Sequence, residues 1–224
     1  MAEKYGTIPK RFTKEWWSWY WMYYKWHTIG VLFVLFLVVL TVTESITAEK
    51  YDTTVIYAGR RYCNDSTVSK VEEVLSPLCE DLDGNGKKSL QFLSYDVDLN
   101  SSDVQYLEAR RLKLDTSFTG GDTFLYIMDK ELADIYKFDG VDTIVFAPLE
   151  DWVTADISGF ETFDAHGKAY GVDISDLKIF KDAGVDTSGL YLFMRYYPRK
   201  EQMKEELKGY EASVELANKM LSVQ

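Results

Sequence analysis

The chain has 224 residues, and 46% of them are hydrophobic, which is enough for a folded domain with a sizeable core. Its formal net charge is −11 at pH 7, but the first 27 residues carry +3, so the rest of the chain carries −14. An acidic surface of this strength excludes nucleic acid as a partner, because phosphates need a basic face.

An uncharged run follows the basic N-terminal segment. Residues 28–43 read TIGVLFVLFLVVLTVT, and extending the run back to Tyr23 gives the length that a helix needs to cross a bilayer. We therefore predict a cytoplasmic and interfacial aromatic segment over 1–22 and a transmembrane helix over 23–43. Trp and Tyr settle where headgroups meet acyl chains, so we expect the lipid bilayer to contact Trp16, Trp17, Trp19, Trp21, Tyr24 and Trp26.

The charges that flank this run predict its orientation. Five Lys and Arg residues precede the run, whereas the first twelve residues after it hold only Lys50. Basic flanks stay in the cytoplasm, so we expect a single-pass plasma-membrane protein with its N-terminus inside. A polar stalk over 44–52 then leads to an extracytoplasmic domain over 53–224. The long aromatic segment favours an uncleaved signal anchor, and cleavage after Ala48 is the alternative.

The outer region alternates between strand and helix patterns. In chain order we predict a strand over 53–59, a helix over 66–77, a strand over 89–97, a helix capped by Asp103 that ends near Thr116, a strand over 123–129, a helix over 130–138, an extended piece over 143–152, strands over 168–175 and 189–197, and a helix over 199–222. This order predicts an α/β fold with one small, open, mostly parallel sheet and helices on both faces.

Two of the predicted helices allow finer predictions. The helix over 66–77 is expected to begin at Asp65 or Ser66 and to separate Cys63 from Cys79 by roughly 18 Å, which is too far for a disulfide. Both thiols are therefore expected to be free and mostly buried. In the helix that follows Asp103, the apolar residues expected to be buried are Val104, Leu107 and Leu112.

Several short motifs resemble the first lobe of extracellular solute-binding proteins. They are VIYAG before a helix, FLYIMDKELADIY, FAPLEDW and KAYGVDIS, and they cover roughly residues 53–175. The resemblance implies a single lobe of the periplasmic-binding-protein type and a small solute as ligand. Those proteins have two lobes and are much longer, so a complete second lobe is not expected here. The aromatic YYKWH before one span also resembles small membrane proteins of Gram-positive, clostridial-type bacteria.

The stretch DLDGNGKKSLQF, residues 81–92, resembles a calcium-binding loop. Oxygens at alternate positions of a DxDxNG turn can surround a calcium ion, so the candidate ligands are Asp81, Asp83, Asn85, Lys87 through its carbonyl, and Ser89. The twelfth position should hold a bidentate acid, but it is Phe92, which the strand pattern places in the core. Weak calcium binding would need another acid, with Glu80, Asp96 and Asp98 as candidates. The alternative is a polar turn without metal.

Ligands of an open parallel sheet bind beyond the carboxyl ends of its strands. This rule places Arg60, Arg61 and Tyr62 at one rim, together with Asp129 at the end of another strand. Two adjacent arginines in an acidic domain can hold a carboxylate or phosphate. The alternative is that they form ordinary surface ion pairs.

No sequence motif indicates an enzyme, because the chain lacks GxSxG, HExxH, GxxxxGK[ST] and CxxC patterns. We therefore expect a membrane-anchored, non-catalytic module that binds a small solute or a partner protein outside the cell. The alternatives are an accessory subunit of a membrane transport complex and an enzyme of unknown class.

Overall fold

The computed structural model describes residues 9–47, 51–119, 123–136, 145–197 and 204–223. The chain forms two compact units, Met1–Glu49 and Lys50–Gln224, and each is considered by itself. Parts of some predicted elements lie outside the described residues: 48–50 of the stalk, 137–138 and 199–203 of two helices, and 143–144 of the extended piece.

The first unit contains one long helix, α1 (Lys14–Thr47), which begins where the Thr13 hydroxyl accepts a hydrogen bond from the Trp16 backbone N–H at 3.2 Å. Its segment Lys14–Thr43 is long and apolar enough to cross a membrane, because an 18-residue stretch within it has a mean hydropathy of 2.2 and none of that stretch is buried. The predicted transmembrane helix over 23–43 therefore lies inside one continuous helix that also carries the aromatic segment.

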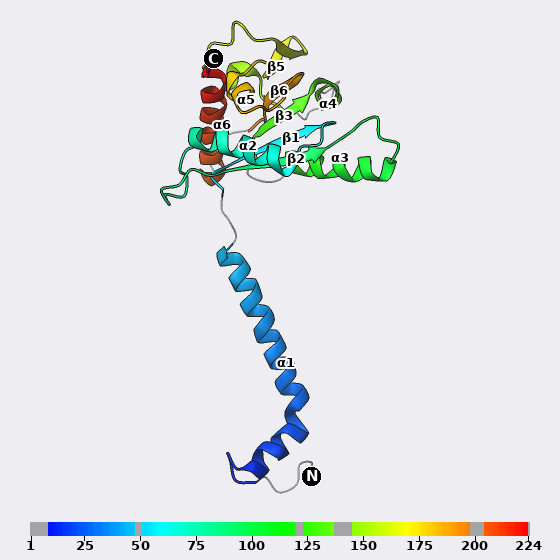
Figure 1. The fold of residues 1–224 in the computed structure, drawn as a ribbon, viewed down its shortest axis with the longest axis vertical. Coiled ribbons are helices and arrows are strands. Elements are labelled where there is room, and N and C mark those ends of the chain that lie inside the picture. Colours follow the sequence, from blue (N-terminus) through cyan, green and yellow to red (C-terminus); the bar gives the residue numbers. More distant parts are fainter. Residues whose placement is uncertain (1–8, 48–50, 120–122, 137–144, 198–203, 224) are drawn as a thin grey trace. The chain divides into compact units, whose positions relative to one another are not determined.

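The second unit is an α/β domain built on one six-stranded sheet (Figure 1). The strands lie in the order β2-β1-β3-β6-β5-β4. Their bounds are β1 (Thr53–Gly59), β2 (Leu90–Asp96), β3 (Leu125–Asp129), β4 (Thr162–Ala165), β5 (Lys168–Asp173) and β6 (Leu190–Met194).

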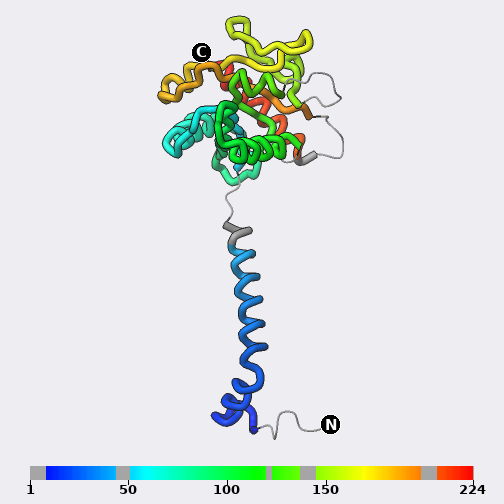
Figure 2. Tube along the Cα trace, turned by 90° about the vertical axis from the view of Figure 1, so that its right-hand side faces the viewer, coloured from blue at the N-terminus to red at the C-terminus, as the bar shows by residue number. Residues whose placement is uncertain are grey.

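Helices cover both faces of this sheet, as the alternation of strands and helices predicts (Figures 1 and 2). One face packs against α2 (Asp65–Leu75), α5 (Lys178–Asp182) and α6 (Lys204–Ser222), with the short turns η1 (Ser76–Leu78) and η2 (Leu149–Asp151) nearby. The other face packs against α3 (Val104–Thr119) and α4 (Lys130–Tyr136). In β1, Val55 and Tyr57 point to the first layer, whereas Ile56 and Ala58 point to the second.

The prediction of a mostly parallel sheet is wrong, because the sheet is mixed. β1 pairs in parallel with β2 and β3, but the pairs β3–β6, β6–β5 and β5–β4 are antiparallel. The cause is clearest at β4 and β5, which only His166 and Gly167 separate. Both residues have positive φ, 50° and 79°, the backbone of a tight hairpin turn that joins antiparallel neighbours.

Local details of two helices also differ from the predictions. The N-cap of α2 is Asn64, whose side chain accepts from the Thr67 N–H at 2.9 Å, rather than Asp65 or Ser66. In α3 the fully buried residue is Leu114, while Val104 and Leu112 are 61% and 66% exposed. The predicted cap of α3 is right, because Asp103 accepts from the Tyr106 N–H at 3.0 Å.

Candidate functional site

The carboxyl ends of β1 and β3 lie side by side, and the chain leaves them in opposite directions. After β1 it passes through α2 to β2 on one side, and after β3 it continues through α4 to the strands on the other side. Such a divergence is where open α/β sheets bind ligands. Because β6 is antiparallel to β3, its first residue, Leu190, lies at the same edge, which we call the carboxyl-end edge.

At this edge, Asp129 connects the two strands through its carboxylate. Its Oδ2 accepts a hydrogen bond from the Arg60 backbone N–H at 3.0 Å, and its Oδ1 accepts from the Leu132 N–H at 2.9 Å at the start of α4. A Cβ on Gly59 would lie 2.7 Å from the Tyr57 hydroxyl oxygen and 2.9 Å from Asp129 Oδ2, so this close approach requires glycine. Both carboxylate oxygens of Asp129 thus accept backbone hydrogen bonds that hold the end of β1 and the start of α4 in place.

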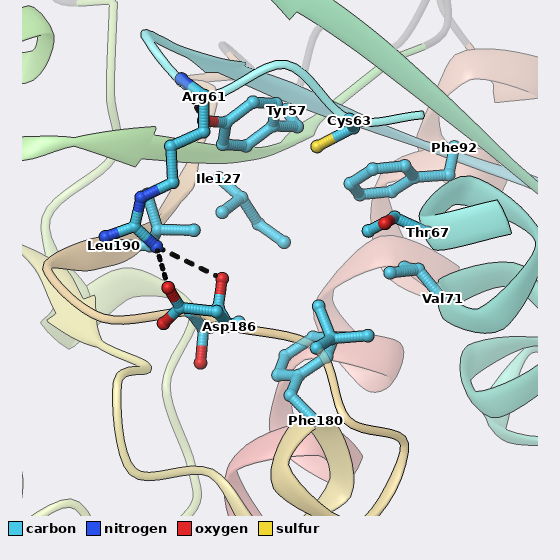
Figure 3. A pocket seen from close by; sticks show the side chains of 12 residues that line it. Tyr57, Arg61, Cys63, Thr67, Val71, Phe92, Ile127, Phe180, Asp186 and Leu190 are labelled. Carbon is cyan, nitrogen blue, oxygen red and sulfur yellow. Dashed lines mark hydrogen bonds and ion pairs between the residues drawn. The ribbon is translucent and has the colours of Figure 1, made fainter. Parts of the chain in front are cut away.

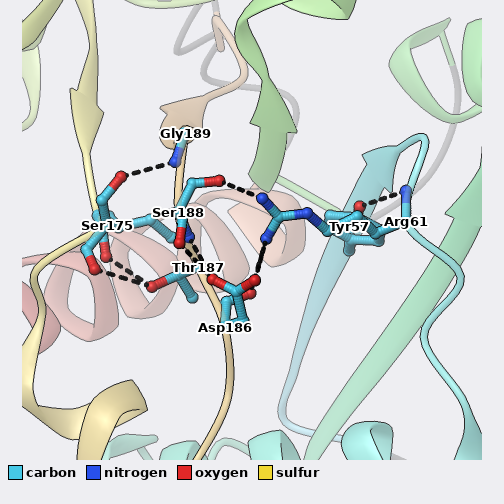
Figure 4. Close-up of polar contacts among 8 residues, drawn as sticks. Tyr57, Arg61, Ser175, Asp186, Thr187, Ser188 and Gly189 are labelled. Atoms are coloured by element: carbon cyan, nitrogen blue, oxygen red, sulfur yellow. Dashed lines mark hydrogen bonds and ion pairs between the residues drawn. The ribbon is translucent and has the colours of Figure 1, made fainter.

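Arg61 extends from the end of β1 to the loop that precedes β6. Its Nη1 lies 2.9 Å from Asp186 Oδ2 and donates to the Asp186 carbonyl at 3.3 Å, and its Nη2 donates to the Ser188 carbonyl at 2.8 Å. Figure 4 shows these contacts together with the bond from the Arg61 backbone N–H to the Tyr57 hydroxyl, at 3.1 Å. The guanidinium therefore joins two segments that lie far apart in the sequence.

The loop that Arg61 contacts, residues 186–189, also forms hydrogen bonds with residues 174 and 175. The buried hydroxyl of Thr187 donates to the Ile174 carbonyl at 2.9 Å, and the Gly189 N–H donates to Ser175 Oγ at 2.8 Å. Asp186 also accepts from the backbone N–H of Ser188, at 3.0 Å, and from its hydroxyl. The hydrogen bonds of Ser188, with Arg61 adding to them, hold the pKa of Asp186 below its usual value. The loop therefore keeps its position without depending on Arg61 alone.

A small cavity of about 40 Å³ is lined by Arg61 on one side and by Cys63, Phe92 and Val71 on the other (Figure 3). Most of its wall is apolar, formed by Val71, Phe92, Ile127, Phe180, Val185 and Leu190, and polar atoms come from Tyr57, Cys63, Thr67, Asp186 and Thr187 in addition to Arg61. Burial raises the pKa of the half-buried Cys63 thiol. The cavity has room for about one or two small groups, since a water occupies ~30 Å³ in the liquid.

The other predicted rim residues lie further out. Arg60 makes an exposed ion pair with Glu131, with Nη1 and Oε1 3.8 Å apart, and Tyr62 is 75% exposed. The structure thus brings Arg60, Arg61 and Asp129 to one edge, as the strand-end rule predicts. It also assigns Arg61 a partner, Asp186, that no spacing in the sequence indicates, because the two residues meet only through the fold.

The same edge carries a wider, open groove of about 520 Å³. It is lined by Gly159, Phe160, Glu161, Asp173, Asp176, Leu177, Lys178 and Val223. Asp173 ends β5, which runs parallel to β3, so the groove lies beside the loop that Arg61 contacts. The groove is a second concave surface of the carboxyl-end edge, and both carboxylates and apolar side chains line it.

The DLDGNG loop forms a turn stabilised by its own carboxylates. Asp81 Oδ1 accepts from the N–H groups of Gly84 and Asn85, at 2.8 and 3.1 Å, and its Oδ2 accepts from Gly86 at 2.8 Å. Asp83 accepts from the Asn85 N–H and side-chain amide, at 2.9 and 2.7 Å. Asn85 in turn accepts from the Lys87 N–H at 2.7 Å.

The third carboxylate near this loop comes from Asp52, just before β1. One oxygen from each of Asp52, Asp81 and Asp83 lies within 4.8 Å of the others. Calcium bonds of ~2.3–2.6 Å place opposite oxygens ~5 Å apart, so these three carboxylates can share one calcium ion. The three acids that the sequence offered as a further calcium ligand make other contacts: Asp96 accepts a hydrogen bond from the Tyr106 hydroxyl, Asp98 accepts one from the Asn100 N–H, and Glu80 lies beside Glu215.

Asp52 holds the two ends of the loop together. Its Oδ1 accepts from the Leu82 N–H at 2.8 Å, while its Oδ2 accepts from the Ser89 N–H and hydroxyl at 2.8 and 2.9 Å. Partial burial raises the pKa of Asp52, but these hydrogen bonds outweigh it, and the net result is a lowered pKa. Phe92 is 6% exposed and belongs to the core, as its strand position predicts.

Aromatic rings cover α1 before the apolar run. Trp16 stacks on Tyr20, with ring centroids 5.4 Å apart, and Tyr20 stacks on Tyr24 at 5.5 Å. On other sides of the helix Trp17, Trp21 and Trp26 are 55%, 56% and 74% exposed, and Trp19 contacts Tyr24 at 5.7 Å. The predicted interface residues therefore surround the helix rather than line one stripe.

No protein-family model, curated protein or solved structure matches this chain. The resemblance to solute-binding proteins thus depends on the short motifs alone and stays a prediction.

Proposed function

We propose that this protein is a single-pass membrane protein whose extracytoplasmic domain binds a small solute or a partner protein at the carboxyl-end edge, without catalysing a reaction. The observation that carries the proposal is the position of Arg61. It covers an apolar cavity at the divergence of β1 and β3, where α/β sheets bind ligands. Apolar walls with a few polar groups at the mouth are typical of binding sites.

Membrane attachment supports this proposal, because an anchored domain can present its edge to ligands at the cell surface. α1 supplies a segment of sufficient length and hydropathy, and the basic residues before it favour a cytoplasmic N-terminus. The proposed localisation is therefore the plasma membrane, with residues 53–224 outside. An uncleaved anchor is part of the proposal.

The hydrogen bonds that the charged groups of the edge already make support a non-catalytic role. Among the described residues, Arg61 is engaged by the 186–188 loop, and Asp129 accepts two backbone hydrogen bonds. His166 lies in the turn before β5, at the opposite edge of the sheet from Arg61. It therefore cannot act as a general base for a group held at Arg61.

The length of α1 favours an accessory subunit of a membrane complex as a second candidate. Its 34 residues extend ~51 Å, whereas a bilayer with its headgroups is ~40–45 Å thick. The aromatic part, residues 14–27, is ~20 Å long, which exceeds a single interfacial layer of roughly 5–8 Å. Rings that extend past this layer can pack against another membrane span.

Hydrogen exchange on the full-length chain in nanodiscs tests the proposal. The chain is incubated with the low-molecular-weight fraction of spent culture medium or with solubilised membranes of the producing cells. We expect slower exchange at 59–63 and 185–190, with the first mixture indicating a solute and the second a protein partner. Unchanged exchange at both segments in both mixtures would contradict a binding role for this edge.

A further inference from the structure

We propose that the Arg61 cavity is a site for short-chain monocarboxylates, such as propionate and butyrate. Their carboxylate would pair with the Arg61 guanidinium in place of Asp186, and their alkyl group would fill the cavity. This inference rests on the proposed binding function and names the chemical class of the ligand.

Arg61 and Asp186 both line the cavity, so its mouth can hold an anion once Asp186 releases the guanidinium. Arg61 is the charged donor that lines the cavity, and a guanidinium matches a planar carboxylate with two parallel N–H donors. Within the described part of the chain, its contacts with Asp186 and Ser188 use three of its five N–H donors. An incoming carboxylate can therefore bind while the bond to the Ser188 carbonyl remains.

Asp186 can release Arg61 without losing all of its partners. Its carboxylate also accepts hydrogen bonds from the Ser188 N–H and hydroxyl. Its side chain is 69% exposed in its pair with Arg61, so water can solvate the oxygen that the guanidinium leaves. An exposed ion pair of this kind contributes little net free energy, which makes exchange for a ligand feasible.

The interior of the cavity limits the size of the ligand. Its lining side chains Val71, Phe92, Ile127 and Phe180 offer no hydrogen bonds to a polar tail. A volume of about 40 Å³ admits one or two methyl-sized groups, by comparison with the ~30 Å³ of a water. Propionate has two carbon groups beyond its carboxylate, and butyrate places two in the cavity when its first methylene stays at the mouth beside Arg61, whereas a long-chain acid such as octanoate exceeds the limit.

Saturation-transfer NMR on the full-length chain in nanodiscs tests the proposal with propionate, butyrate, octanoate and butyramide. We expect saturable transfer to propionate and butyrate and none that butyrate displaces from octanoate or butyramide. Butyramide has the same shape as butyrate without the charge, so it isolates the contribution of Arg61.

Two variants examine the two halves of the site separately. Arg61→Gln removes the charge and should weaken butyrate binding about tenfold or more, since hydrogen bonds to charged groups are the strong ones. Val71→Leu adds a methylene at a wall that is 3% exposed, so it should weaken butyrate binding more than acetate binding. Lys168→Gln removes a positive charge and the exposed pair with Glu150 at the opposite edge of the sheet, so it should leave binding unchanged.

Binding of butyrate that is unchanged in both Arg61→Gln and Val71→Leu would overturn the proposal, as would the absence of saturable binding at tens of millimolar. If carboxylates fail but the exchange experiment still shows protection at 59–63 and 185–190, only the ligand class is wrong. If that protection is also absent, the binding function itself fails.

Discussion

Asp52→Asn removes the acceptor that joins both ends of the DLDGNG loop to the start of β1. The wild-type carboxylate accepts hydrogen bonds from the Leu82 N–H, the Ser89 N–H and the Ser89 hydroxyl. An amide retains one oxygen, but its NH₂ group would face donors, so at least one charge-assisted bond is lost. Such a bond contributes ~1.5–3 kcal/mol when shielded, and the partial exposure of Asp52 reduces this to ~1–2 kcal/mol.

For a domain of this size, that loss lowers the melting temperature by about 2–8 °C. The assay is thermal unfolding of the full-length chain in detergent, followed by circular dichroism. Asp164→Asn is the matched control, because Asp164 makes an exposed bond to the Thr162 hydroxyl at the sheet edge, and its cost should stay within ~0.5 kcal/mol.

The pH dependence gives a second readout of the same contact. The folded pKa of Asp52 is lowered, so its contribution is fully present above the pKa that it has in the unfolded chain and is lost as the pH falls through the folded pKa. The wild-type advantage over Asp52→Asn should therefore shrink as the pH falls below about 5. Equal melting temperatures near neutral pH, or a difference that stays constant with pH, would refute this account of Asp52.

The remaining predictions concern calcium, the thiols and a glycine. About 10 mM calcium acting on a ~1 mM site should stabilise the chain by about 1.4 kcal/mol, magnesium should do much less, and Asp81→Ala with Asp83→Ala should abolish the shift; equal responses to both ions would leave the loop as a turn. In the folded chain Cys79 should react with a maleimide very slowly, because burial raises its pKa to about 11, whereas both cysteines should react after unfolding without reductant; two unreactive thiols would indicate a disulfide. Gly59→Ala should lower the free energy of unfolding in urea by ~1–3 kcal/mol, while Gly159→Ala, which has open space around it, should cost far less; similar midpoints for the two would contradict the tight approach at Gly59.

Strong local patterns predicted the elements that position the site. The strand over 53–59 is found with those bounds, and β3 is buried on both faces, as its apolar run indicates. In contrast, β4 is four residues long and α5 five, too short for periodicity to reveal. The mixed pairing also escaped prediction, because only the strand over 168–175 was predicted beside the His166–Gly167 turn, and a hairpin needs a second strand on its other side.

The contacts that define the candidate sites are long-range, and this limits what a sequence reveals about them. Arg61 and Asp129 were predicted at one edge because strand ends coincide in a parallel arrangement. Asp186 meets Arg61 across 125 positions, and Asp52 meets Ser89 across 37. No local motif encodes such pairs, although the Asp, Ser and Gly residues of 186–189 do indicate a turn.

The membrane orientation of the candidate site is measured most directly with two variants at matched exposure, each carrying one cysteine in a chain whose Cys63 and Cys79 are replaced by serine. Tyr62→Cys lies at the carboxyl-end edge, where Tyr62 is 75% exposed, and Phe12→Cys lies before α1, where Phe12 is 78% exposed. A membrane-impermeant maleimide is applied to intact protoplasts and, separately, to permeabilised ones. The proposed anchored binding module predicts labelling of Tyr62→Cys in intact protoplasts and of Phe12→Cys only after permeabilisation. Labelling of Phe12→Cys from outside, or protection of Tyr62→Cys until permeabilisation, would contradict it.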